Sequence, residues 1–138
     1  MRTPLLALVF TLVRWSAAQA DPAPIALPGG AVLAIDPAGI AVQLVEVTDA
    51  RCPSDVACVW EGTIRLVLRV GPGGPAEQAI VLCNACDDGG PSATAVGHQF
   101  DFVRLEPAVW VIETLGRDAT VADYTGFVRM TALSSDAG

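Results

Sequence analysis

Four cysteines and a single histidine are the residues of this chain whose side chains most readily do chemistry. Cys83 and Cys86 form a C-x-x-C pair, which can be a thiol-redox centre, half of a zinc site or a structural disulfide. A redox pair needs a helix N-terminus that stabilises its thiolate, whereas Asp87 and Asp88 place negative charge here. A zinc ion needs four ligands, and only these two aspartates and His98 lie nearby. We therefore predict a structural disulfide and expect no metal.

The other two cysteines lie in a dense motif, D-x-R-C-P-x4-C-x-W-x-G, over residues 49–62. The motif predicts a loop that is closed by a covalent bond between Cys52 and Cys58 and leads into a strand. A ring this short stabilises a domain by roughly 2 kcal/mol. Four cysteines allow three pairings. We favour local pairing, Cys52–Cys58 with Cys83–Cys86, and keep open the pairing Cys58–Cys86 with Cys52–Cys83, which a hairpin between the two pairs would bring close.

The same motif holds the residues that we predict to form a binding surface, Arg51, Trp60 and Glu61. Arg51 is expected to pair on the surface with Asp49 or Asp55, an interaction worth little energy in solvent. Trp60 is expected to cover the disulfide. The last glycine of the motif would let another backbone or a ring approach closely.

This motif resembles that of a largely uncharacterised family of small exported bacterial proteins, many of them lipoproteins. A weaker similarity extends to residues 102–107 and to the Asp123-Tyr124 pair before the last predicted strand. The resemblance implies a Cys52–Cys58 disulfide and an exported domain, but it transfers no activity. The chain departs from the family in three ways. It has no cysteine for lipidation near residue 20, it has Glu61 where a small residue is usual, and it adds a second cysteine pair.

Residues 1–20 have the order of a secretory signal peptide: a basic start, an apolar run over residues 4–13, and Ala18-Gln19-Ala20 at the expected cleavage point. Ten apolar residues reach roughly 15 Å as a helix, about half the hydrocarbon thickness, so we expect no stable membrane span. The predicted location is the periplasm or the medium. In that oxidising compartment an even number of cysteines favours disulfides.

The composition predicts a folded, acidic domain. The chain has 138 residues, of which 52% are hydrophobic and only 17% charged, unlike disordered chains. All basic residues are arginine, and without the leader six of them face fifteen carboxylates. Such a balance repels phosphate backbones, so we expect no nucleic-acid partner.

Alternating hydrophobicity predicts the elements that position these residues. The clearest strand spans residues 60–70, followed by a Gly/Pro-rich reversal and a returning strand at residues 78–82. Further short strands are expected at residues 31–35, 40–48, 99–105, 109–112 and 124–133. A change of parity between Phe102 and Val103 predicts a bulge. Residues 83–97 are expected to be a loop.

These elements predict an all-β fold, a small antiparallel β-sandwich or barrel of about seven short strands stapled by disulfides. The expected organisation is the signal peptide (residues 1–20), a flexible segment leading into the domain (21–30), one β domain (31–134) and a C-terminal tail (135–138).

No catalytic constellation is recognisable in the sequence. His98 is the sole histidine and no G-x-S-x-G elbow accompanies a serine. The expected function is therefore that of an exported, non-enzymatic binding or accessory module without a cofactor, whose partner is an envelope protein or a small ligand. The alternatives are an exported hydrolase inhibitor, and a metal-binding or thiol-redox protein that uses Cys83, Cys86 and His98. Trp60 and Trp110 could line a groove, although core packing is the default for strand aromatics.

Overall fold

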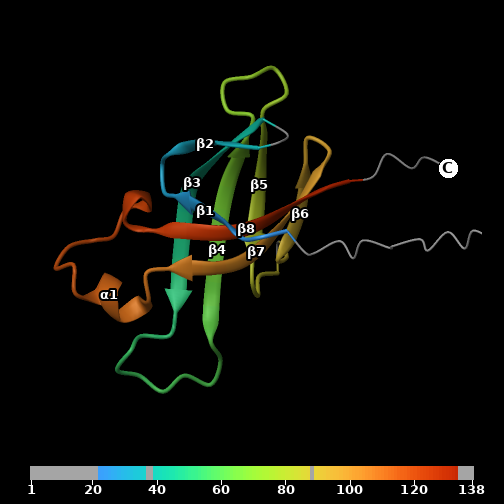
Figure 1. Ribbon diagram of the computed structural model, residues 1–138. Helices are drawn as coiled ribbons and strands as arrows, with labels where there is room; N and C mark the ends of the chain where they lie inside the picture. The colour runs from blue at the N-terminus through green and yellow to red at the C-terminus, as the bar shows by residue number, and fades with distance from the viewer. Residues whose placement is uncertain (1–21, 37–38, 88, 134–138) are drawn as a thin grey trace, which may run out of the picture.

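The computed structural model describes residues 22–36, 39–87 and 89–133 (Figure 1). The predicted leader and the tail at residues 135–138 lie outside the described residues. Within them the regular secondary structure is almost entirely β, arranged as two four-stranded antiparallel sheets. The predicted all-β sandwich is confirmed. The alternative prediction, a barrel, is not, because the described strands form two separate sheets.

One sheet contains the first strand and the last three strands of the chain, and the other contains the four strands between them. The first sheet has the order β1 (Ile25–Pro28), β8 (Thr125–Ala132), β7 (His98–Glu106), β6 (Ser92–Ala95). The second has the order β2 (Val32–Ile35), β3 (Ile40–Arg51), β4 (Gly62–Val70), β5 (Gln78–Cys83). Figure 1 shows the strands of one sheet running across those of the other. A short helix, α1 (Val109–Glu113), and a 3-10 turn, η1 (Val121–Asp123), connect β7 to β8.

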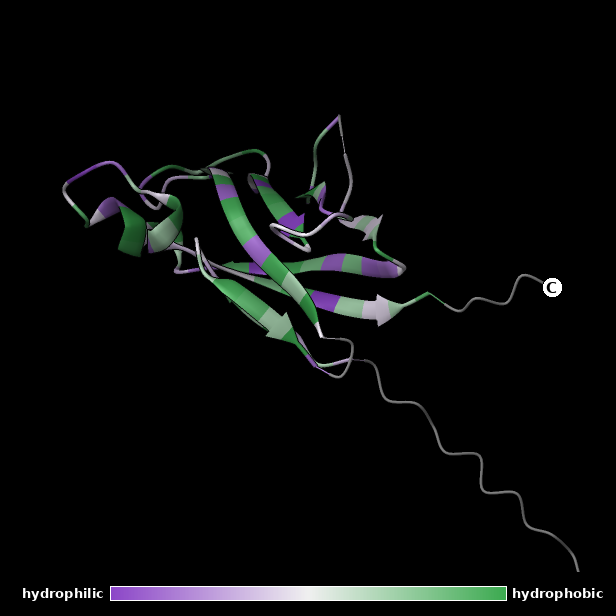
Figure 2. Cartoon of the chain, turned by 90° about the horizontal axis from the view of Figure 1, so that it is seen from above, coloured by the Kyte–Doolittle hydropathy of each residue, from purple (hydrophilic) through white to green (hydrophobic). Residues whose placement is uncertain are grey.

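The core lies between the sheets and follows the predicted alternation. On β4 every second residue from Ile64 to Val70 is buried, and Figure 2 shows the alternation as green and purple bands along the strands. The fully buried side chains of this core are Phe100, Leu27, Leu44, Leu66, Leu68, Leu82, Val42, Val70 and Val128. Burying a side chain of this kind stabilises by about 1.5–3 kcal/mol, which makes the intersheet layer the main source of stability.

Both long strand pairs contain a bulge. The register of β7 against β8 shifts between Phe102 and Arg104, which confirms the bulge predicted from the sequence. A second shift, between Leu44 and Glu46, interrupts the pairing of β3 with β4. Bulges increase local twist, and here they accompany two sheets that cross.

The segment that we expected to be flexible, residues 21–30, contains strand β1. Leu27 on this strand is fully buried, and the glycine pair after it connects the sheets. Gly29 N–H donates to the Tyr124 carbonyl at 2.8 Å, and Gly30 N–H donates to the Leu44 carbonyl at 2.8 Å. A Cβ on Gly29 would lie 1.7 Å from the Val121 carbonyl oxygen. These glycines therefore permit a tight crossing, and residues 25–28 of this segment form a strand paired with β8.

Two expectations about elements were wrong. Residues 109–112 were expected to form a strand but belong to α1, where Val111 N–H donates to the Ala108 carbonyl at 3.0 Å. Both edges of β7 are already paired with β6 and β8, so the segment after β7 has no free edge there to join. The expected loop at residues 83–97 contains β6.

No helix in the described part of the chain has the length and apolarity needed to cross a bilayer.

Candidate binding surface

The loop between β3 and β4 is closed by a disulfide between Cys52 and Cys58. The β3–β4 ladder continues up to the pair Arg51–Gly62, so the loop leaves directly from paired strands. Gly62 has φ of +84°, and a Cβ there would lie 2.3 Å from the Ala50 carbonyl oxygen. The close backbone approach predicted for this glycine is therefore present.

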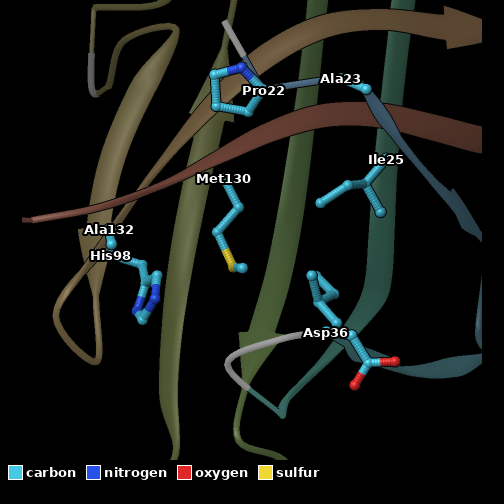
Figure 3. Close-up of a pocket in the computed structure, with 8 residues that line it drawn as sticks. Pro22, Ala23, Ile25, Asp36, His98, Met130 and Ala132 are labelled. Atoms are coloured by element: carbon cyan, nitrogen blue, oxygen red, sulfur yellow. The ribbon is translucent and has the colours of Figure 1, made fainter. Parts of the chain in front are cut away.

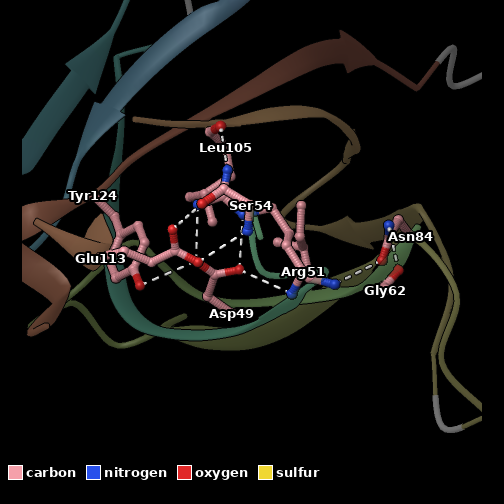
Figure 4. Close-up of polar contacts among 9 residues, drawn as sticks. Asp49, Arg51, Ser54, Gly62, Asn84, Leu105, Glu113 and Tyr124 are labelled. Atoms are coloured by element: carbon pink, nitrogen blue, oxygen red, sulfur yellow. Dashed lines mark hydrogen bonds and ion pairs between the residues drawn. The ribbon is translucent and has the colours of Figure 1, made fainter. Parts of the chain in front are cut away.

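Asp49 and Arg51 form a brace at the base of the loop (Figure 4). Arg51 donates from Nε to Asp49 Oδ1 and from Nη2 to Asp49 Oδ2, both at 2.8 Å. The Tyr124 hydroxyl donates to Asp49 Oδ2 at 3.2 Å. Arg51 Nη1 also lies 3.5 Å from the Leu105 carbonyl oxygen. The brace thus joins the end of β3 to β7 and to the start of β8, across the two sheets.

This brace is partly buried, which corrects the expected surface ion pair. The Arg51 side chain is 16% exposed and that of Asp49 is 8% exposed. Burial disfavours the charged carboxylate of Asp49, but the hydrogen bonds and charge of Arg51 outweigh burial and hold the pKa of Asp49 below its ordinary value. Burial and the adjacent Asp49 raise the pKa of Tyr124. We therefore assign Arg51 to the support of the loop, not to its exposed surface.

Asp123 orients the tyrosine of this brace. Its carboxylate accepts two hydrogen bonds from Arg117, at 2.7 and 2.8 Å, and one from the Thr120 N–H at 2.7 Å. These hydrogen bonds, led by those from Arg117, lower the pKa of Asp123. They fix η1 immediately before Tyr124, so the Asp123-Tyr124 pair noticed in the sequence has a structural role.

The cysteine loop is also joined to α1. Ser54 N–H donates to Glu113 Oε1 at 3.0 Å, and the Ser54 hydroxyl donates to Glu113 Oε2. Hydrogen bonds from Ser54 lower the pKa of the Glu113 carboxyl. This contact was not predicted from the sequence, because Glu113 lies on α1, where a strand was expected.

The second disulfide, Cys83–Cys86, lies at the end of β5 and extends the sheet at the same end of the molecule. The Asn84 side chain accepts a hydrogen bond from Ile64 N–H at 2.7 Å, and Asn84 N–H donates to the Ile64 carbonyl at 3.3 Å. The favoured local pairing of the four cysteines is confirmed, and the pairing of Cys58 with Cys86 was wrong.

Four exposed hydrophobic side chains lie on the cysteine loop and on α1, the two segments that the Ser54–Glu113 contact joins. We call them the apolar end surface, which consists of Val56 (53% exposed), Val59 (95%), Trp60 (76%) and Trp110 (60%). Trp110 and Glu113 share α1, so the Ser54 contact joins both parts of this surface. Figure 1 shows the cysteine loop projecting beyond the end of β3 and β4.

Trp60 does not lie where we expected. β4 begins at Gly62, so Trp60 precedes the strand and its exposed side chain does not act as a cover buried over the disulfide. Glu61 is exposed beside it. Of the three predicted surface residues, the structure therefore places Trp60 and Glu61 on the surface and Arg51 beneath it.

His98 lies elsewhere, at the first residue of β7. Its Nδ1 lies 2.9 Å from the Val96 carbonyl oxygen. Cys83 and Cys86 are joined to each other, and no three His, Cys, Asp or Glu side chains of the described segments gather as metal ligands would.

Comparison with known proteins adds no relative: no protein-family model, no curated protein and no solved structure matches this chain.

Proposed function

We propose that this protein is a non-enzymatic binding module that contacts a protein partner through the apolar end surface. The observation that carries the proposal is the exposure of Val59 and Trp60 on a loop closed by a disulfide. Large hydrophobic side chains that gather on a surface mark sites of interaction, and tryptophan is enriched among residues that dominate binding energy.

The shape of this end favours a protein over a small ligand. Small-molecule sites are concave and enclose most of the ligand surface, whereas these side chains stand on a projecting loop and on a short helix (Figure 1). A partner with a complementary hollow could enclose Trp60 and Val59 and remove both from water.

The supports beneath the loop favour binding because they restrict its motion in advance. The disulfide closes the loop, the Asp49–Arg51 brace holds its first strand, and Ser54 joins it to Glu113. A loop already held in one conformation loses less conformational entropy when a partner binds. Substrate-like loops of hydrolase inhibitors use the same principle, so a hydrolase is one class of partner that the test includes.

We infer that the partner is met in the periplasm or the medium. The signal-peptide pattern of residues 1–20 and the two disulfides support this location. The acidic balance of the chain favours a partner other than nucleic acid. A thiol-redox function would first require reduction of the Cys83–Cys86 bridge, and a metal site would need ligands that the described residues do not bring together.

Site-specific photocrosslinking tests the proposal. The full chain is expressed with benzoylphenylalanine in place of Val59, or in place of Val32 as the matched control, since Val32 is an exposed valine (57%) on β2. We expect a discrete crosslinked protein from position 59 and none from position 32. Equal crosslinking at both positions, or turnover of a substrate by the purified protein, would contradict the proposal. A hydrolase in the crosslinked band, inhibited by the purified protein, would identify the inhibitor class.

A further inference from the structure

A second candidate site lies at the opposite end of β3 from the cysteine loop. It is a cavity of about 460 Å³ between the two sheets, bounded by residues 22–23, by Ile25 on β1, and by Ile35 at the end of β2. Met130 and Ala132 on β8 form another wall. Ile35 pairs with Ile40, the first residue of β3, whereas the cysteine loop follows its last residue. The cavity is therefore separate from the apolar end surface.

Most of the cavity wall is hydrophobic, and two polar side chains complete it. Figure 3 shows the Met130 side chain between His98 on one side and Ile25 with Asp36 on the other. A volume within the usual range for ligand sites, an apolar floor and a few polar groups are the features of small-molecule pockets.

Both polar side chains are hydrogen-bond acceptors. The Val96 carbonyl can only accept, so His98 Nδ1 is the donor in their 2.9 Å contact. In the neutral ring, Nε2 is then left as an acceptor. The Asp36 carboxylate contributes negative charge at the exposed rim. Neither Lys nor Arg is among the described residues that line the cavity.

We propose that this cavity binds a small amphipathic cation, a molecule with an apolar body and a protonated amino group. The apolar body would contact Ile25, Ile35 and Met130, and the ammonium group would donate to the Asp36 carboxylate at the rim. The acidic balance of the whole chain favours the same sign of ligand charge. This proposal is independent of the partner proposed for the apolar end surface.

The test compares three probes of nearly the same shape: phenethylamine, phenethyl alcohol and hydrocinnamate, which are cationic, neutral and anionic at neutral pH. Each is titrated into protein purified after expression of the full chain, and NMR follows the Met130 methyl group and the His98 ring protons. We expect saturable binding of phenethylamine, about fivefold tighter than that of hydrocinnamate because the rim charge is exposed. Equal or tighter binding of hydrocinnamate would overturn the proposal, as would the absence of saturation by phenethylamine.

Variants locate the site. Ala132→Trp, at an exposed residue that ends β8, fills the cavity and should abolish phenethylamine binding. Asp36→Asn should weaken binding about threefold through loss of the charged acceptor. Asp55→Asn, an exposed carboxylate on the cysteine loop, is the matched control and should leave binding unchanged. Retained binding by a folded Ala132→Trp variant, or equal weakening by Asp36→Asn and Asp55→Asn, would contradict the assignment.

Discussion

At the scale of single residues, the motif around the first cysteine pair divides into support and surface. Asp49 and Arg51 are partly buried and hold the base of the loop, whereas Val59 and Trp60 are exposed. Arg51, which looks like a binding residue in the sequence, therefore acts with Asp49 on the position of the hydrophobic residues of the loop.

Replacing Asp49 tests the brace. Asp49→Asn removes the charge that Arg51 faces inside the protein, so we expect the free energy of unfolding at pH 7 to fall by about 2 kcal/mol. Tyr124→Phe removes one neutral donor to the same carboxylate and should cost about 1 kcal/mol. Urea unfolding measures both. Stability unchanged in Asp49→Asn would mean that the brace does not hold the fold.

The brace also predicts a pH dependence with a definite sign. The pKa of Asp49 in the folded protein lies below its ordinary value of 3.8. Its stabilisation is therefore complete above about pH 3.8 and is lost as the pH falls through the folded-state pKa. The stability difference between the wild-type protein and Asp49→Asn should shrink on acidification below that value. A difference that grows in acid would contradict this assignment.

Gly62, the first residue of β4 after the cysteine loop, has a backbone conformation that favours glycine. Gly62→Ala should lower the free energy of unfolding by at least about 2 kcal/mol, because φ is positive and the added Cβ meets the Ala50 carbonyl. Gly73→Ala is the matched control, since φ there is +77° and nothing lies within 4 Å of the added Cβ. It should cost about 1 kcal/mol. Equal losses in the two variants would show that the close approach to Ala50 is unimportant.

At the scale of elements, the turn between β6 and β7 is strained. Ala95 pairs with His98, so the turn has two central residues, Val96 (φ +49°) and Gly97 (φ +71°). Two positive φ angles suit asparagine followed by glycine, and a β-branched residue is disfavoured there. Val96→Asn should therefore raise the free energy of unfolding by about 1 kcal/mol in urea titrations. Val32→Asn, on a regular strand, should give no such gain, and a loss of stability in Val96→Asn would contradict the explanation.

The elements that could be predicted from the sequence were those with a local signal. Alternation located the hydrophobic face of β4, the Gly/Pro-rich reversal located the β4–β5 hairpin, and a change of parity located the β7 bulge. β1 was missed because the prolines and glycines around it suggest flexibility, and its pairing with β8 is distant in sequence. α1 was missed because its β-branched residues favour a strand when taken alone.

The candidate site was predictable only in part, because only some of its features have a local signal in the sequence. Local pairing of the cysteines was favoured from the sequence, and the resemblance implied Cys52–Cys58, but spacing alone left a second pairing open. The burial of Arg51 was not predicted, because it depends on Tyr124 and Leu105, which approach only when the two sheets pack. The exposure of Trp60 depends on a strand that begins at Gly62, and propensities locate strand ends poorly.

For the molecule as a whole, the proposed function requires export and oxidation of the four cysteines. The intact mass of protein isolated from the envelope or the medium should correspond to the chain without its leader and with two disulfides. Peptide mapping without reduction should recover the Cys52–Cys58 and Cys83–Cys86 pairs. Free thiols at all four positions, or a retained leader, would contradict the predicted compartment.

Binding of a partner by the apolar end surface can be measured as an affinity for the crosslinked partner. Hot-spot aromatic residues contribute about 2 kcal/mol or more, so Trp60→Ser should weaken binding at least about thirtyfold in calorimetry. Val32→Ser, the matched exposed control at the other end of the sandwich, should bind as the wild-type protein does. Equal affinity of the Trp60→Ser variant and the wild-type protein would contradict the proposed function.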